Sequence, residues 1–321
     1  MRNRVASTSV MRTATFNEPA FPMKSSVAYL LALFALVVLP LQLIHANDPH
    51  VVVQRDVPYV PGGGNEQRMD LYLPVGRDLP IILYLHEGSL TSGDKKDSPY
   101  EAIGKNFARA GIGFIVANYR LGPNNKWPVM AEDCAAAFAW MKRNARRLHA
   151  NPAKMFIVGH SSGALIAALL STDEKYLKKY GCSLSDIAGC VSLGTMLNPS
   201  YDTDPFSRTT LDSLWDRVKM RENYESLFQT AEAYRDADPS RHITKNSPPF
   251  LILIAEAERF QPPILEQANR FAQSMEHVHV SVQIEVLKNR RHVTAMEKMA
   301  DPDDPTLLRI LNFVRSHELK Q

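Results

Sequence analysis

One serine in a glycine-flanked turn is placed for nucleophilic chemistry. The turn reads G-H-S-S-G at residues 159–163, between an apolar run at 155–158 and strong helix formers at 164–170. This order of strand, sharp turn and helix is the context in which G-x-S-x-G holds its serine hydroxyl clear of the backbone. We therefore expect Ser161 to be a nucleophile. The unpaired N–H of Ser162, at the start of the helix, is expected to stabilise an oxyanion.

A serine hydroxyl is a weak nucleophile and needs a base, which in turn needs an orienting group. In open α/β sheets the reactive site lies beyond the carboxyl ends of the strands. His277 and His279 begin the last predicted strand, at the wrong end, and their H-x-H spacing fits one polar strand face better than a metal site. His317 falls in the terminal helix. His292 follows the carboxyl end of the last strand and is the expected base.

Two carboxylates could orient that base. Glu256 and Glu258 both follow the apolar strand predicted at 250–254. Their positions along the chain leave the choice between them open.

Apolar runs alternate with helical patterns along the chain. Strands are expected at 51–53, 69–74, 80–85, 113–117, 155–158, 188–193, 250–254 and 278–286, and helices at 100–110, 128–147, 164–170, 262–275 and 304–317. Such alternation predicts an α/β fold with a mostly parallel sheet covered by helices on both faces. The glycines at 62–64 lead into a strand and not a helix, so they predict a hairpin turn and not a phosphate-binding loop. Residues of about 198–247 lack a clear strand and are expected to form a small helical cap insertion.

The N-terminal region is expected to be a separate leader. Residues 27–44 are almost wholly apolar and follow basic residues, which is typical of a secretory signal. We expect a leader at 1–46 and a single domain at 47–321, with translation starting at Met1 or at Met23. The protein is then exported, or is held in the membrane by the leader if the leader is not cleaved.

Charge and cysteine content exclude some classes of protein. The net charge is +3, and the leader carries the excess, so the body is neutral and a nucleic-acid partner is not expected. Three cysteines make no disulfide framework. Cys182 and Cys190 could pair in an exported protein, but buried free thiols are the expected state.

Several segments together resemble a known family. They read M-D-L-Y-L-P at 69–74, Y-L-H at 84–86 with S-G-D-K at 92–95, N-Y-R-L at 118–121, W-P at 127–128 with E-D at 132–133, the turn at 159–163, and P-P-F-L-I-L at 248–253. From about residue 56 to 292 the chain resembles the α/β-hydrolase fold. Within that fold it resembles the esterase/lipase group that includes feruloyl and acetylxylan esterase-like and kynurenine formamidase-like enzymes.

The resemblance implies an eight-stranded sheet and an order of serine, acid and histidine that matches Ser161, Glu258 and His292. The family's acid usually ends a G-x-x-D turn, and the corresponding A-E-A-E at 255–258 favours Glu258 over Glu256. The family's H-G-G-G loop corresponds to H-E-G-S at 86–89. The resemblance therefore implies that Gly88 and Ser89 supply oxyanion N–H groups together with Ser162.

This sequence departs from the family pattern at Glu87, which replaces a glycine. A carboxylate aimed at an oxyanion would raise the barrier. We therefore expect Glu87 to turn away, for example towards an arginine, or the activity to be low. Leu90 stands where many family members carry tryptophan.

The expected function is an exported serine esterase that needs no cofactor or metal. Its expected substrate is an acyl ester of a carbohydrate or a small molecule. The same residues could run an amidase or peptidase reaction, and a non-catalytic binding protein on a hydrolase scaffold is the alternative from another class. The oligomeric state is not predicted.

Overall fold

The computed structural model describes residues 48, 50–194, 197, 222, 224–259 and 264–317. Contacts divide the chain into two units, Met1–Ile44 and His45–Gln321. The predicted leader and half of the predicted cap insertion, including 198–221, lie outside the described residues. In the part that is described, no helix is both long enough and apolar enough to cross a bilayer.

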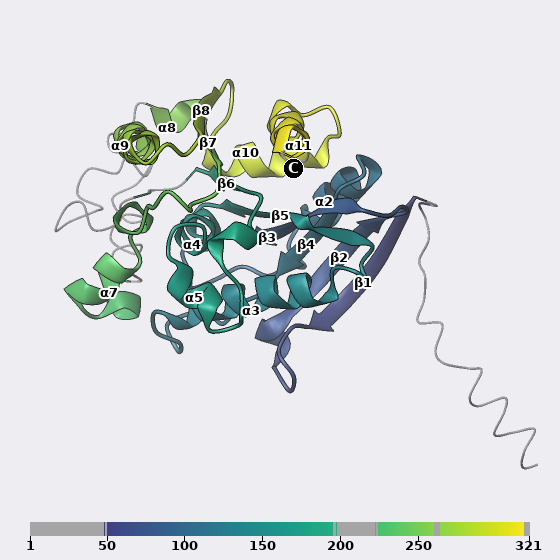
Figure 1. Ribbon diagram of the computed structural model, residues 1–321, viewed down its shortest axis with the longest axis horizontal. Coiled ribbons are helices and arrows are strands. Elements are labelled where there is room, and N and C mark those ends of the chain that lie inside the picture. The colour runs from purple at the N-terminus through teal and green to yellow at the C-terminus, as the bar shows by residue number, and fades with distance from the viewer. Residues whose placement is uncertain are drawn as a thin grey trace, which may run out of the picture. The chain divides into compact units, whose positions relative to one another are not determined.

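Eight strands form one mostly parallel sheet in the order β1-β2-β4-β3-β5-β6-β7-β8 (Figure 1). Among the described strands, only β1 with β2 and β2 with β4 pair antiparallel. This confirms the predicted fold class. The strands are β1 Val51–Pro58, β2 Arg68–Pro74, β3 Leu79–Leu85, β4 Gly113–Ala117, β5 Ala150–His160, β6 Gly189–Leu193, β7 Phe250–Ala255 and β8 Val282–Leu287.

Helices cover both faces of the sheet (Figure 1). Alternate residues of β5 point to opposite faces of the sheet. Met155 and Ile157 belong to one buried hydrophobic cluster, and Phe156 and Val158 belong to the other. A strand buried on both sides must be apolar at every position, which is why these strands read as continuous apolar runs. The first cluster contains α3 Val129–Asn144, α4 Ser162–Leu170, α5 Glu174–Lys178 and α9 Ile264–His277, and the second contains α2 Tyr100–Arg109 and α11 Pro305–His317.

The last strand starts later than the sequence predicted. β8 begins at Val282 and not at 278, because α9 continues to His277 and a turn follows it. Val280 donates its backbone N–H to Met275 O in that turn, where His279 has a φ of 62°. The polar–apolar alternation that suggested a longer strand therefore includes turn residues.

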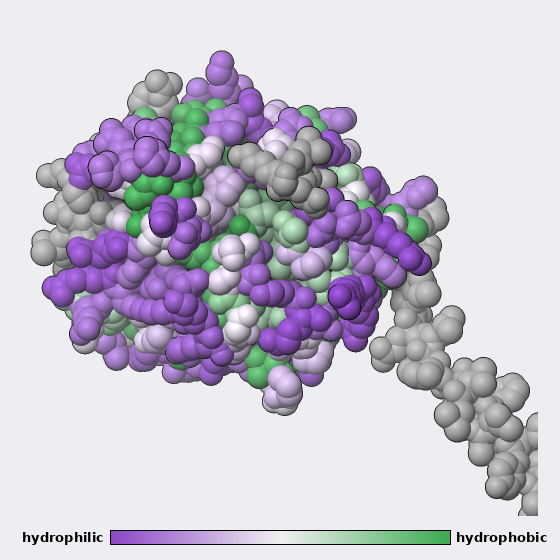
Figure 2. All heavy atoms as spheres, in the orientation of Figure 1, coloured by the Kyte–Doolittle hydropathy of each residue, from purple (hydrophilic) through white to green (hydrophobic). Residues whose placement is uncertain are grey.

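The glycines at 62–64 lie between the antiparallel strands β1 and β2, as predicted. Of the cap segment, the structure describes helical residues at 224–228 and α7 Ala231–Asp236. The three cysteines are free and buried, so no disulfide joins them. The face in Figure 2 is mainly hydrophilic, with hydrophobic side chains gathered in smaller groups.

Candidate active site

Ser161 occupies a strained position between β5 and α4. Its φ of 53° and ψ of −124° are rarely adopted by a residue with a side chain. Its backbone N–H donates to Leu193 O on the neighbouring strand at 2.9 Å, which holds the turn in place. Strain of this kind persists only where the surroundings fix it, and it is concentrated at functional sites.

Two glycines make this turn possible. A Cβ added to Gly159 would lie 2.3 Å from the carbonyl oxygen of Gly163. A Cβ added to Gly163 would lie 2.2 Å from the carbonyl oxygen of Leu85. The strand, the helix and the neighbouring loop therefore approach one another closely only because both positions lack a side chain.

His292 and Glu258 converge on this serine. The Nε2 of His292 lies 2.9 Å from Ser161 Oγ, and its Nδ1 lies 2.5 Å from Glu258 Oε1. Glu258 is buried, and its Oε2 accepts the backbone N–H of Ala255 at 2.9 Å. The imidazole can therefore accept a proton from the serine while its other nitrogen donates to a fixed carboxylate.

The structure also separates the two candidate carboxylates. Glu256 begins the short helix α8 Glu256–Arg259, and its Oε2 accepts the backbone N–H of Asn289 at 2.8 Å. This hydrogen bond stabilises the turn that leads to α10 His292–Glu297. Of the two, Glu258 is the one that reaches the imidazole.

The loop after β3 presents backbone N–H groups next to the serine turn. Gly88 and Ser89 have φ values of 118° and 54°, and a Cβ at Gly88 would lie 2.0 Å from Ser92 O. Leu90 donates its N–H to Ser162 Oγ at 3.3 Å, so this loop contacts the start of α4. Within the described ranges, no acceptor bonds the backbone N–H of Gly88, Ser89 or Ser162. These groups remain available to an incoming oxygen.

A buried ion pair anchors the far end of the same loop. Lys95 Nζ lies 2.7 Å from Asp70 Oδ1 on β2 and 2.7 Å from Asp56 Oδ1 on β1. Both Lys95 and Asp70 are buried. Lys95 also donates its backbone N–H to Asn118 Oδ1 at 2.6 Å. The loop is thus held to the sheet at Lys95 as well as at the end of β3.

Glu87 does turn aside, but towards Tyr100 and His160 and not towards an arginine. Tyr100 donates its hydroxyl hydrogen to Glu87 Oε2, and His160 Nδ1 lies 3.3 Å from the same oxygen. Burial opposes ionisation of Glu87, but the hydrogen bonds from His160 and Tyr100 outweigh it and lower its pKa to about 2. The sequence showed His160 inside the serine turn but carried no signal that Glu87 would meet it.

The other histidines considered from sequence do not meet Ser161. His277 ends α9, and His317 ends α11, where its Nδ1 contacts the carbonyl oxygen of Phe313. Across the residues described, no three His, Cys, Asp or Glu side chains are grouped to hold a metal ion.

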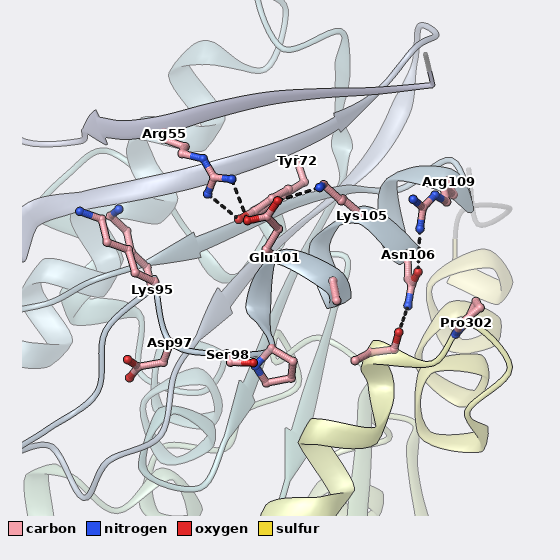
Figure 3. A pocket seen from close by; sticks show the side chains of 14 residues that line it. Arg55, Tyr72, Lys95, Asp97, Ser98, Glu101, Lys105, Asn106, Arg109 and Pro302 are labelled. Carbon is pink, nitrogen blue, oxygen red and sulfur yellow. Dashed lines mark hydrogen bonds and ion pairs between the residues drawn. The ribbon is translucent and has the colours of Figure 1, made fainter. Parts of the chain in front are cut away.

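A separate pocket lies beside α2, and none of the three converging residues lines it (Figure 3). Its basic side chains have acidic partners. Arg55 and Lys105 both contact Glu101 at 2.7 Å, as Figure 3 shows, and Arg109 pairs with Asp48. This pocket is therefore distinct from the site at Ser161.

A mostly parallel eight-stranded sheet with a serine, a histidine and a carboxylate meeting beyond its strand ends is the arrangement of an α/β hydrolase. The chain belongs to the alpha/beta hydrolase fold family, which it matches over residues 82–296. The predicted family resemblance is thereby confirmed.

Two relatives indicate the chemistry found in this family. The chain is similar to Esterase LipQ of Mycobacterium tuberculosis, with 26% identity over 245 residues, or 71% of this chain and 55% of LipQ. It is also similar to an ethyl acetate hydrolase of Pseudomonas putida, with 24% identity over 286 residues, or 85% of each protein. The chain spans about half the length of LipQ and of two further Mycobacterium tuberculosis relatives.

A solved structure shares the fold. An esterase from Pyrobaculum calidifontis superimposes with a TM-score of 0.70 at 19% identity, covering 85% of this chain and 88% of that one. At this identity the likeness shows the fold alone.

Proposed function

We propose that this protein is a serine hydrolase that cleaves carboxylic esters through an acyl-enzyme intermediate. The observation that carries the proposal is the continuous contact from Ser161 Oγ through His292 to Glu258, at 2.9 and 2.5 Å. The similarity to an esterase and to an ethyl acetate hydrolase supports ester cleavage.

In the proposed acylation step, Ser161 Oγ attacks the ester carbonyl and His292 Nε2 takes its proton. Glu258 accepts the Nδ1–H of His292, which selects the tautomer with a free Nε2 and stabilises the imidazolium that forms. His292 then gives the proton to the leaving alcohol. The bond formed joins Oγ to the acyl carbon, and the bond broken is the ester C–O bond.

The charge that develops on the carbonyl oxygen needs preorganised donors. We assign this role to the backbone N–H groups of Gly88, Ser89 and Ser162, which have no acceptor in the described part of the chain. Each such donor contributes about 2.7–4 kcal/mol to a reaction of this kind. A water molecule, activated by His292, then attacks the acyl group and releases the acid by the same path.

We further propose an acyl ester of a carbohydrate or a small molecule as the substrate, and export directed by the apolar leader at 1–46. An N-terminal mass measurement on the cellular protein tests whether this leader is cleaved. A mature chain that begins after the apolar stretch agrees with cleavage, and a chain that retains the stretch contradicts it.

A panel of short p-nitrophenyl esters tests the catalytic proposal. Ser161→Ala is expected to abolish hydrolysis. The matched control Ser185→Ala, at an exposed position in a short 3-10 turn, is expected to leave it unchanged. Folded wild-type protein that cleaves none of the esters would favour the binding-protein alternative. A protein that cleaves the matching anilides faster than the esters would favour the amidase alternative.

A further inference from the structure

The imidazole of His160 lies fully buried at the centre of the proposed site. It directly precedes Ser161 in the chain. Its Nδ1 lies 3.3 Å from Glu87 Oε2, and its Nε2 lies 3.0 Å from the carbonyl oxygen of His292. The rings of His160 and His292 have centroids 4.7 Å apart. One side chain therefore contacts both the loop of backbone donors and the main chain of the proposed base.

Glu87 is held in this orientation from its other side. Tyr100, which is buried at the start of α2, donates its hydroxyl hydrogen to Glu87 Oε2. The Tyr100 ring packs on Tyr84 of β3 with centroids 5.4 Å apart, so its position is fixed by the core. Glu87 is thereby kept beside His160.

Both neighbours of the His160 ring nitrogens are acceptors. An ionised carboxylate and a backbone carbonyl can only accept hydrogen bonds, and a neutral imidazole has a single N–H. The two contacts are therefore both hydrogen bonds only when His160 carries both protons. Burial lowers the pKa of His160, and the hydrogen bond to Glu87 opposes that effect. Glu87 thus faces one ring nitrogen of His160 and the carbonyl oxygen of His292 faces the other.

We propose that Glu87 and His160 form a second carboxylate–histidine pair, which positions His292 by donating His160 Nε2–H to its backbone carbonyl. His160 is a positioning residue, because it acts through His292 and touches no reacting atom. This inference rests on the proposed function, since it concerns the same base. It also explains how a carboxylate is tolerated next to Gly88, because the contacts with His160 and Tyr100 turn it sideways.

Two substitutions of His160 separate positioning from packing. The amide nitrogen of asparagine falls near Nδ1, and that of glutamine falls near Nε2. His160→Gln can therefore still donate to the His292 carbonyl, whereas His160→Asn can contact only Glu87. We expect kcat to fall about 10–100-fold in His160→Asn with little change in KM, because a displaced base costs rate and not binding. His160→Gln should stay within about threefold of the wild type.

Equal losses of kcat in the two His160 variants, or an effect confined to KM, would overturn the proposal.

Substitutions of Glu87 supply a second comparison. Glu87→Ala removes the support of His160 and should lower kcat, whereas Glu87→Gln keeps the shape and an acceptor for Tyr100 and should recover most of it. A rise in kcat for Glu87→Ala would show that the carboxylate opposes the oxyanion, and would also overturn the proposal.

A titration of His160 by NMR of ¹⁵N-histidine-labelled protein does not depend on hydrolysis. The titratable groups facing His160 are Glu87 after β3, Glu258 on α8 and His292 on α10, with Tyr100 behind Glu87. Glu87→Gln removes the one negative charge in hydrogen-bond contact with His160, so the pKa of His160 should fall by about one unit or more.

An unchanged pKa of His160 in Glu87→Gln would show that the pair does not exist. If the pKa falls as expected but the wild-type protein cleaves no ester, the pair stands and the proposed function fails.

Discussion

The Nε2 of His292 lies 2.9 Å from the Oγ of Ser161, although 131 positions separate the two residues along the chain. The sheet brings them together, because β5 and β8 both end at the same edge. Serine follows the first strand directly, and histidine begins the helix after the second.

Glu258→Gln should lower kcat by about 10³–10⁴-fold, because an amide no longer selects the imidazole tautomer or stabilises its charge. Glu256→Gln is the matched control, since Glu256 accepts a backbone N–H from Asn289 and does not contact His292. Its kcat should stay within about threefold of the wild type. Steady-state kinetics on one ester gives kcat for both variants. Equal losses of kcat in Glu258→Gln and Glu256→Gln would show that Glu258 does not act in the mechanism.

Gly163→Ala should destabilise the fold by about 1–3 kcal/mol or more, because the new methyl group would overlap backbone atoms of Leu85 and His86. Gly64→Ala is the control. Gly64 has a φ of −72° and open space around it, so its change should stay within about 1 kcal/mol. Urea unfolding measures the free energy of unfolding of both variants. A Gly163→Ala protein as stable as the wild type would contradict the close approach of Gly163 to the backbone of Leu85 and His86.

Lys95→Met should lower the free energy of unfolding by about 3–5 kcal/mol, because it removes the buried ammonium that lies 2.7 Å from the buried carboxylate of Asp70. Lys96→Met changes the neighbouring exposed lysine and should cost no more than about 0.5 kcal/mol. Denaturant unfolding of the two variants provides the comparison. Similar stabilities would show that the Lys95–Asp70 contact does not anchor the loop.

Acid should remove the stability that Glu87 contributes. Hydrogen bonds from His160 and Tyr100, against the effect of burial, lower the pKa of Glu87 from its ordinary 4.5 to about 2. A carboxylate with a depressed pKa stabilises the fold fully above its unfolded pKa and loses this effect as the pH falls through the folded one. The contribution, about 3 kcal/mol at most, is therefore present above about pH 4.5 and lost towards pH 2.

The measurement is unfolding free energy against pH for wild type and Glu87→Gln. The wild-type advantage should be constant at neutral pH and should shrink within that acid window. Parallel curves from neutral pH down to about pH 2 would mean that Glu87 is not held as a carboxylate in the native state.

Much of the fold could be predicted because buried parallel strands must be apolar at every position, as in the run at 155–158. Ser161 and His292 were also named from sequence, since the order of strands along the chain dictates which loops share an edge. Glu258 was favoured over Glu256 only by the resemblance to the family's acid-bearing turn. The catalytic roles of all three stay predictions until they are tested. The contacts of Glu87 could not be predicted, because they depend on where α2 and the serine turn sit relative to one another. The start of β8 was misplaced for a local reason, since turn residues such as His279 continued the alternation of the strand.

The most direct test of the central claim is mass spectrometry of the folded protein after treatment with a fluorophosphonate probe. We predict one covalent adduct, on the peptide that contains Ser161, which is absent from Ser161→Ala and retained in Ser185→Ala. A wild-type protein that stays unmodified, or one modified at another serine, would contradict the account.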